Sequence, residues 1–245
     1  MSGHSKWSSI KHKKGALDAK RGKLFTKLSK DLTIAAKSGS EPESNAVLRL
    51  AIQKAKDANM PSTNIDRAIK KASGVGSESI LEEIVYEGYG PGGSAIIVDS
   101  ITDNKNRTAS EVRLAFNRNG GNLGESGVVA WQFKVCGLLR IEDYLGDTDE
   151  MQLLAIDSGA EDISIDGANI EIITDPSLLE SIRLNLVNKN ISIASMEIIR
   201  IADNLLTLDN HDVLKTIKLL EALDDLDDVS RVQSNIAIPD EILTS

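Results

Sequence analysis

Apolar residues in the first third of the chain recur at the spacing of a helix. One stripe runs between residues 15 and 37, and Gly39 follows it as a helix-ending residue. A second stripe spans residues 44–59 and stops at Pro61. A third begins at Ser62, a common N-cap type, and ends before Gly74. Three helices with short connections predict a small bundle.

After the glycine-containing segment 74–77, the pattern changes to strands that alternate with helices. Strands are expected at residues 94–101 and 128–134. The helix between them, at about 108–118, would be opened by a capping box of Thr108 and Glu111.

The next part of the chain follows the order β-α-β-β-α-β. Strands are expected at 137–142, 162–166, 169–174 and 191–201, and helices at 148–158 and 176–188. That order is typical of a ferredoxin-like unit. A strand at 204–208, a helix at 211–224 capped by Asp209 and a strand at 229–238 remain. Joined to residues 94–134, they would complete a second such unit.

The predicted fold class is therefore α+β, with a three-helix domain and two ferredoxin-like domains, one inserted in the other. The helical domain covers residues 1–76. The discontinuous α+β domain comprises residues 77–135 and 203–245, and the inserted domain covers residues 136–202.

Charge divides the chain more sharply than its average suggests. The net charge is -9, but residues 1–75 contain 16 basic and 6 acidic side chains, and the rest contains 12 basic and 31 acidic ones. A basic part of this kind attracts polyanions, whereas the acidic part avoids them or meets basic partners.

The cations gather most densely in the first 30 residues, which hold nine Lys and Arg and one acid, Asp18. Some precede the first helix, and Lys20, Lys23, Lys27 and Lys30 share one side of it. Such a stripe can follow a phosphate backbone. Trp7 could stack on a base or fold onto the bundle. The predicted nucleic-acid-binding residues are Lys6, Trp7, Lys11, His12, Lys13, Lys14, Lys20, Arg21, Lys23, Lys27 and Lys30. The alternative is a solvated helix face.

Two loops are weaker candidates for a secondary contact. The glycine-rich segment 88–93 lacks the ending of a P-loop and precedes a strand, so it predicts a tight β–β connection that could still present Tyr89. The loop at 103–108 offers Asn104, Lys105 and Arg107 to a partner, although capping and turn chemistry would explain it equally well.

Residues 55–65 have spacings that suggest a helix-turn-helix, but an ordinary turn between helices is the better interpretation.

Catalysis, metal binding and cofactors find little support. The histidines His4, His12 and His211 are scattered, Cys136 is the single cysteine, and common catalytic motifs are absent. The acidic run of residues 224–228 could bind a cation but is more often simply solvated. We expect no catalytic residues, no metal site and no cofactor.

The cysteine content and the distribution of apolar residues predict a cytoplasmic protein. A lone cysteine suits a reducing compartment. The chain shows no secretory leader and no apolar run of spanning length, so no membrane partner is expected.

Several longer motifs resemble those of the YebC/PmpR family. They are residues 3–7 (GHSKW), 10–14 (IKHKK), 21–23 with 25–27, 59–61 (NMP), 86–93 (YEGYGPGG), 102–104 with 106–108, and 120–121 with 123–124. The resemblance covers nearly the whole chain and is strongest over residues 1–134. It implies a three-domain architecture in agreement with the layout above.

The resemblance also implies a role in gene expression. Bacterial members are described as DNA-binding transcriptional regulators, whereas mitochondrial relatives look like translational activators and bacterial members have also been tied to the ribosome. The expected partner is therefore DNA or ribosomal RNA, with a further protein partner for the acidic domains. Charge alone does not separate the two roles.

Overall fold

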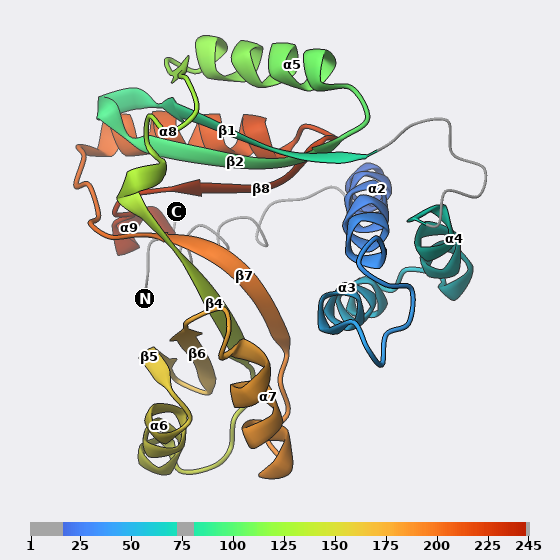
Figure 1. Ribbon diagram of the computed structural model, residues 1–245. Helices are drawn as coiled ribbons and strands as arrows, with labels where there is room; N and C mark the ends of the chain where they lie inside the picture. The colour runs from blue at the N-terminus through green and yellow to red at the C-terminus, as the bar shows by residue number, and fades with distance from the viewer. Residues whose placement is uncertain (1–16, 73–80, 244–245) are drawn as a thin grey trace. The chain divides into compact units, whose positions relative to one another are not determined.

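The computed structural model describes residues 17–72 and 81–243 (Figure 1). It divides into two compact units. Residues 134–201 form one, and the segments on both sides of them form the other. Within the described residues, no helix is long and apolar enough to cross a membrane.

The first unit described here begins with three helices: α2 (Leu17–Ala36), α3 (Ala46–Asp57) and α4 (Ser62–Ala72). The helical stripes of the sequence bury side chains from all three helices, among them Leu32, Leu48 and Ile65. The Asn45 side chain caps α3 by accepting from the Leu48 amide. Its own amide group donates to the Ala35 carbonyl at 2.8 Å, which ties α3 to the end of α2. The three predicted helices are confirmed.

The same unit contains a sheet in the order β3-β1-β2-β8, built from β1 (Glu82–Tyr89), β2 (Ala95–Thr102), β3 (Asn122–Leu123) and β8 (Val229–Ser234). Helices α5 (Lys105–Arg118) and α8 (Asn210–Asp224) share one hydrophobic core with Ile96 and Val98 of β2. Ala95 and Ile97 belong to a different core cluster, with Val129 and Phe133. Strand β2 is therefore covered on both faces, which explains its continuous apolar run.

Short elements complete this unit. They are the 3-10 turns η1 (Pro91–Gly93) and η2 (Ala130–Gln132), and the helix α9 (Asp240–Leu243). η1 lies in the tight connection from β1 to β2, as the glycine-rich segment predicts.

The unit formed by residues 134–201 has the predicted ferredoxin-like order. Its elements are β4 (Phe133–Ile141), α6 (Thr148–Asp157), β5 (Ala160–Asp166), β6 (Asn169–Thr174), α7 (Leu179–Asn188) and β7 (Ser195–Ala202), and its sheet order is β5-β6-β4-β7. Leu139, Met151 and Ile182 lie in its core. The α+β fold class is confirmed.

Two expected strands are wrong. Residues 128–132 are not a strand and β4 begins only at Phe133, because the Glu87 carboxylate accepts from the amides of Gly127, Val129 and Ala130 and curls the chain before β4. The strand beside β1 is instead the short β3. Residues 204–208 contribute one isolated bridge, from Leu206 to Ile236.

The capping box predicted for α5 is also wrong. The helix begins at Lys105, and Asn104 caps it by accepting from the Arg107 amide at 3.1 Å. Thr108 lies inside the helix and is fully buried, because its hydroxyl serves a tertiary hydrogen bond described below.

Close packing at Gly88 generates a stability prediction. A Cβ atom at Gly88 would lie 2.5 Å from the Asn122 carbonyl oxygen and 2.8 Å from the Phe116 ring, both of which are held in place. We expect Gly88→Ala to lower the free energy of unfolding by about 1–3 kcal/mol, as overpacking does. Urea denaturation followed by circular dichroism measures this.

Gly22→Ala is the matched control. A Cβ at Gly22 meets nothing within 4 Å and lies on helix α2, so the same substitution should stabilise by about 0.5–1 kcal/mol. Equal effects at the two glycines would contradict the packing argument.

Candidate nucleic-acid interface

Three of the predicted binding lysines lie against the chain's own acids. Lys23, Lys27 and Lys30 are spaced by four and three residues and share one side of α2, which we call the lysine face. They donate to residues 224–228, which begin at the last residue of α8 and which we call the acidic segment. Lys27 and Lys30 are therefore engaged within the unit rather than open to solvent, whereas Lys23 lies at the exposed edge of the contact.

Each lysine has its own acceptors. Lys23 Nζ lies 3.0 Å from the Asp225 carbonyl oxygen, and Lys27 Nζ donates to the Asp224 carbonyl oxygen. Lys30 Nζ lies 2.8 Å from the Asp227 carbonyl oxygen and 2.5 Å from Asp228 Oδ1. The sequence analysis did not anticipate this contact, because its two sides lie about 200 residues apart.

The end of α8 explains why lysines bind there. The last carbonyl groups of a helix have no partner within it, and they form the negative end of its dipole. Asp224 and Asp225 add carboxylates at the same end, with ion-pair distances of 3.8 Å to Lys27 and 3.6 Å to Lys23. The lysine face therefore neutralises a site where several negative groups accumulate.

Asp228 is the most heavily bonded group of the acidic segment. Its side chain is 3% exposed. Oδ2 accepts from the hydroxyl groups of Thr102 and Thr108 at 3.1 and 2.7 Å, and from Arg107 Nη2 at 2.7 Å, while Oδ1 accepts from Lys30.

Burial opposes the ionisation of Asp228, but the hydrogen bonds from Lys30, Thr108 and Arg107 outweigh it. They hold the pKa of this carboxyl group well below its usual range. The expectation that the acidic run is simply solvated is therefore wrong for Asp228.

The N-cap and first turn of α5 make structural contacts through each of the candidate residues. Asn104 caps the helix, and Lys105 Nζ lies 2.6 Å from Glu82. Arg107 also pairs with Asp103 at 2.9 Å. Capping and ion pairing thus account for these residues, whereas contact with a partner stays a prediction.

Glu87 and Trp131 belong to a loop arrangement that the sequence analysis missed. Glu87 is buried and fixes the 127–130 loop as described above. The Tyr89 hydroxyl and the Trp131 Nε1 both donate to the Val128 carbonyl oxygen, at 3.2 and 3.1 Å. Trp131 is 73% exposed. A glutamate directly after the apolar run 84–86 was the available signal.

Other cations of the helical domain remain exposed. Arg67, Lys70 and Lys71 lie on the side of α4 opposite the buried Ile65 and Ala68, and no ion pair joins them to an acid among the described residues. We call these three residues the α4 basic face. Helix α4 follows the turn that the sequence analysis interpreted as an ordinary connection between helices rather than as part of a base-reading helix-turn-helix.

The remaining candidate residues are only partly described. The Arg21 guanidinium lies 5.6 Å from the centre of the Phe25 ring, within cation–π distance. Lys20 lies in α2, but its side chain is outside the described residues, as are Lys6, Trp7, Lys11, His12, Lys13 and Lys14.

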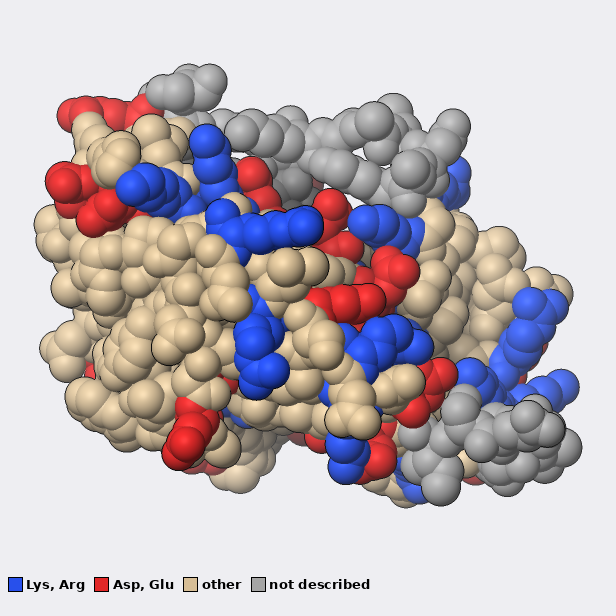
Figure 2. Space-filling view, turned by 90° about the horizontal axis from the view of Figure 1, so that it is seen from above, with Lys and Arg blue, Asp and Glu red and all other residues tan. Residues whose placement is uncertain are grey.

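Basic and acidic side chains also alternate elsewhere on the surface. Figure 2 shows a face on which Lys and Arg lie beside Asp and Glu rather than apart from them. Separation of charge along the chain therefore does not translate into equal separation on the surface.

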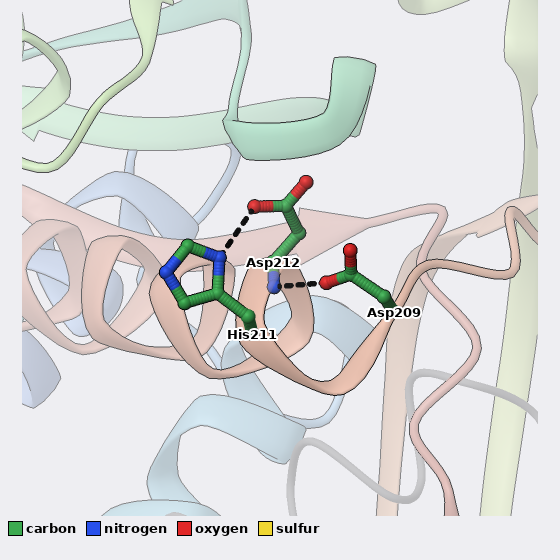
Figure 3. A group of neighbouring side chains, drawn as sticks. All are labelled: Asp209, His211 and Asp212. Carbon is green, nitrogen blue, oxygen red and sulfur yellow. Dashed lines mark hydrogen bonds and ion pairs between the residues drawn. The ribbon is translucent and has the colours of Figure 1, made fainter.

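One small group of side chains meets the geometry of a metal site. Among the described residues, Asp209, His211 and Asp212 have ligand atoms within 4.8 Å of one another (Figure 3). Asp209 accepts from the Asp212 amide at 2.8 Å and caps α8, and His211 Nδ1 lies 3.3 Å from Asp212 Oδ1. Helix capping explains this exposed group, so it does not point to a metal.

The bonding of Asp228 predicts a pH-dependent stability. We expect Asp228→Asn to lower the free energy of unfolding by about 3–5 kcal/mol at pH 7, because it leaves the largely buried Lys30 and the buried hydroxyl groups of Thr102 and Thr108 without a charged acceptor. A depressed native pKa stabilises above the unfolded value of about 3.9 and loses its effect as the pH falls further. The difference between wild type and variant should therefore shrink below that pH.

Urea denaturation at pH 7 and at a series of acidic pH values measures this difference. Asp225→Asn, at an exposed position, is the control and should stay within about 0.5 kcal/mol of wild type. If the free energy of unfolding lost in Asp228→Asn does not become smaller in acid, the role assigned to the Asp228 charge is contradicted.

Known proteins resemble this chain over almost its full length. A probable transcriptional regulatory protein of Dehalococcoides mccartyi is 50% identical over 244 residues, covering 99% of this chain and 97% of the relative. One of Dictyoglomus thermophilum is 49% identical over 247 residues, covering 100% and 99%. The crystal structure of a conserved hypothetical protein from Aquifex aeolicus has a TM-score of 0.86 at 44% identity and covers 96% of this chain and 97% of that one.

Family models account for both parts of the sequence. The model described as the TACO1/YebC protein N-terminal domain matches residues 5–75. The model described as the TACO1/YebC second and third domain matches residues 81–236. The chain belongs to the TACO1/YebC family.

Proposed function

We propose that this protein is a non-catalytic, nucleic-acid-binding regulator of gene expression in the cytoplasm, and that it binds DNA as a transcriptional regulator. The relatives named above are called probable transcriptional regulatory proteins, which supports the general role. A nucleic-acid partner is inferred from the charges of this chain, and DNA is inferred from the transcriptional role in those names.

The α4 basic face is the observation that carries the proposal. Arg67, Lys70 and Lys71 are exposed on one side of a short helix and have no acidic partner in the described chain. They belong to a segment in which basic residues outnumber acidic ones by 16 to 6. Cations that are not neutralised by the protein can replace the counterions of a phosphate backbone, which drives binding.

An RNA- or ribosome-associated translation factor is the second candidate. The exposed Trp131 favours it, because its indole N–H is already bonded to the Val128 carbonyl and its ring remains accessible. Aromatic side chains placed in this way stack on the unpaired bases of single-stranded RNA.

Crosslinking and sequencing of nucleic acid bound in cells separates the two roles when combined with ribosome co-sedimentation. Discrete promoter DNA without ribosome co-sedimentation supports the transcriptional role. Crosslinks to ribosomal RNA near a functional centre support the translational one. Absence of any crosslinked nucleic acid would contradict both.

Removal of the α4 basic face should weaken binding in a salt-dependent way. For R67Q/K70Q/K71Q we expect the slope of log K against log salt to become shallower by about 2–3, since each contacted phosphate contributes about 0.9. Fluorescence anisotropy with a mixed-sequence DNA duplex, over a series of salt concentrations, measures the slope.

The control for this variant removes the same charge from elsewhere. K189Q/K215Q/K218Q neutralises three exposed lysines of the acidic parts of the chain, and its slope should stay near that of wild type. If both variants change the slope equally, only net charge matters and the α4 basic face has no special role.

The N-terminal lysines give an independent prediction. K11E/K13E/K14E should weaken binding to all sequences alike and flatten its salt dependence, because these residues contact phosphates rather than bases. The same titration measures both quantities. Unchanged affinity and slope would show that this segment makes no contact.

A further inference from the structure

We propose that the acidic segment is an intramolecular competitor of nucleic acid for the lysine face. Nucleic acid would reach Lys23, Lys27 and Lys30 only after the acidic segment has left them. The proposal deepens the function proposed above and rests on it. It assigns a regulatory role to a contact that would otherwise serve stability alone.

Burial is the first step of the argument. The side chains of Lys27 and Lys30 are 13% and 18% exposed, and their acceptors Asp224 and Asp228 are 17% and 3% exposed. A phosphate group therefore has no access to these two ammonium groups while the contact is formed. Of the three lysines, only Lys23, whose side chain is 45% exposed, remains accessible at the edge of the contact.

The chemistry of the acceptors is the second step. The acidic segment offers a row of carbonyl and carboxylate oxygens to three lysines along one helix face. An ammonium group is a compact charge with no strict demand on geometry, so it binds carboxylate and phosphate oxygens alike. The segment thus presents what a nucleic-acid backbone would present.

The third step is that the contact can open without leaving a buried charge unpaired. When Lys30 leaves, Asp228 keeps its hydrogen bonds from Thr102, Arg107 and Thr108. The carbonyl groups at the end of α8 become accessible to water. Opening therefore avoids the large penalty of an isolated buried carboxylate.

The helical domain is also able to move as a body. Its hydrophobic core consists of residues from 25 to 72 alone, so separation from the sheet does not break that core. The neighbouring link from Lys37 Nζ to the Leu81 carbonyl oxygen is a single, partly buried hydrogen bond.

The affinity of DNA tests the proposal. In D224K/D225K the acidic segment repels the lysine face, so a larger fraction of molecules should be open. Because apparent affinity scales with the binding-competent fraction, we expect DNA to bind at least about 5-fold more tightly. Anisotropy titration of the full-length chain with a mixed-sequence DNA duplex measures this.

E142K/D157K is the matched control, since it adds the same charge at two exposed acids of the other unit. In this control, the added positive charge should raise the affinity for DNA by less than about 2-fold. Equal gains in both variants would overturn the proposal, as would no gain in D224K/D225K.

Spin labels at Gln53→Cys and Asn117→Cys report the contact directly, with the buried Cys136 left in place. Double electron–electron resonance should show a changed distance distribution when DNA is added to the labelled protein. D224K/D225K should show that change without DNA. An unchanged distribution in that variant would overturn the proposal.

The two proposals fail in distinguishable ways. If DNA binds and the distance distribution stays as it was, the competitor role is overturned while nucleic-acid binding stands. If neither DNA nor RNA binds to wild type or to D224K/D225K, the proposed function is overturned and the competition with it.

Discussion

The buried carboxylate of Asp228 is the interaction on which the larger unit depends. It joins the entry to β8 to the end of β2, to the first turn of α5 and to α2, through Thr102, Arg107, Thr108 and Lys30. A charge with so little exposure needs several such donors, because an isolated buried carboxylate costs several kcal/mol. The constraint therefore fixes several sequence positions at once. It explains why the 102–108 motif contains two threonines and an arginine at these spacings. A separate, steric constraint acts at Gly88, where Phe116 and the Asn122 carbonyl leave no room for a side chain.

Sequence reasoning succeeded where structure is determined locally. The three N-terminal helices and the order of the 134–201 unit follow from periodicity and turn residues, which act over a few positions. It failed where a distant residue decides the local conformation. Glu87 turns residues 127–130 out of a strand, and Asp228 takes the Thr108 hydroxyl that a capping box would have used. Neither partner can be identified from spacing, because each lies at least 40 residues away along the chain.

The candidate site shows the same limit more clearly. Helical spacing correctly places Lys23, Lys27 and Lys30 on one side of α2. It cannot say what that side faces, and the acidic segment that binds it comes from the other end of the chain. Sequence reasoning weighed the acidic run only as a solvated surface or a cation site, so the two halves of one contact were assessed separately.

Charge along a sequence and charge on a surface are therefore different quantities. A segment with many lysines can present few of them, since its own protein supplies the nearest anions. What matters for a polyanion is the number of cations that can exchange their present partner for a phosphate, together with the free energy of that exchange. On this criterion the α4 basic face is available at once, whereas the lysine face becomes available only when its contact with the acidic segment opens. A protein arranged in this way would bind weakly through a few cations and more tightly after opening, so its affinity would depend on an internal equilibrium as much as on the partner.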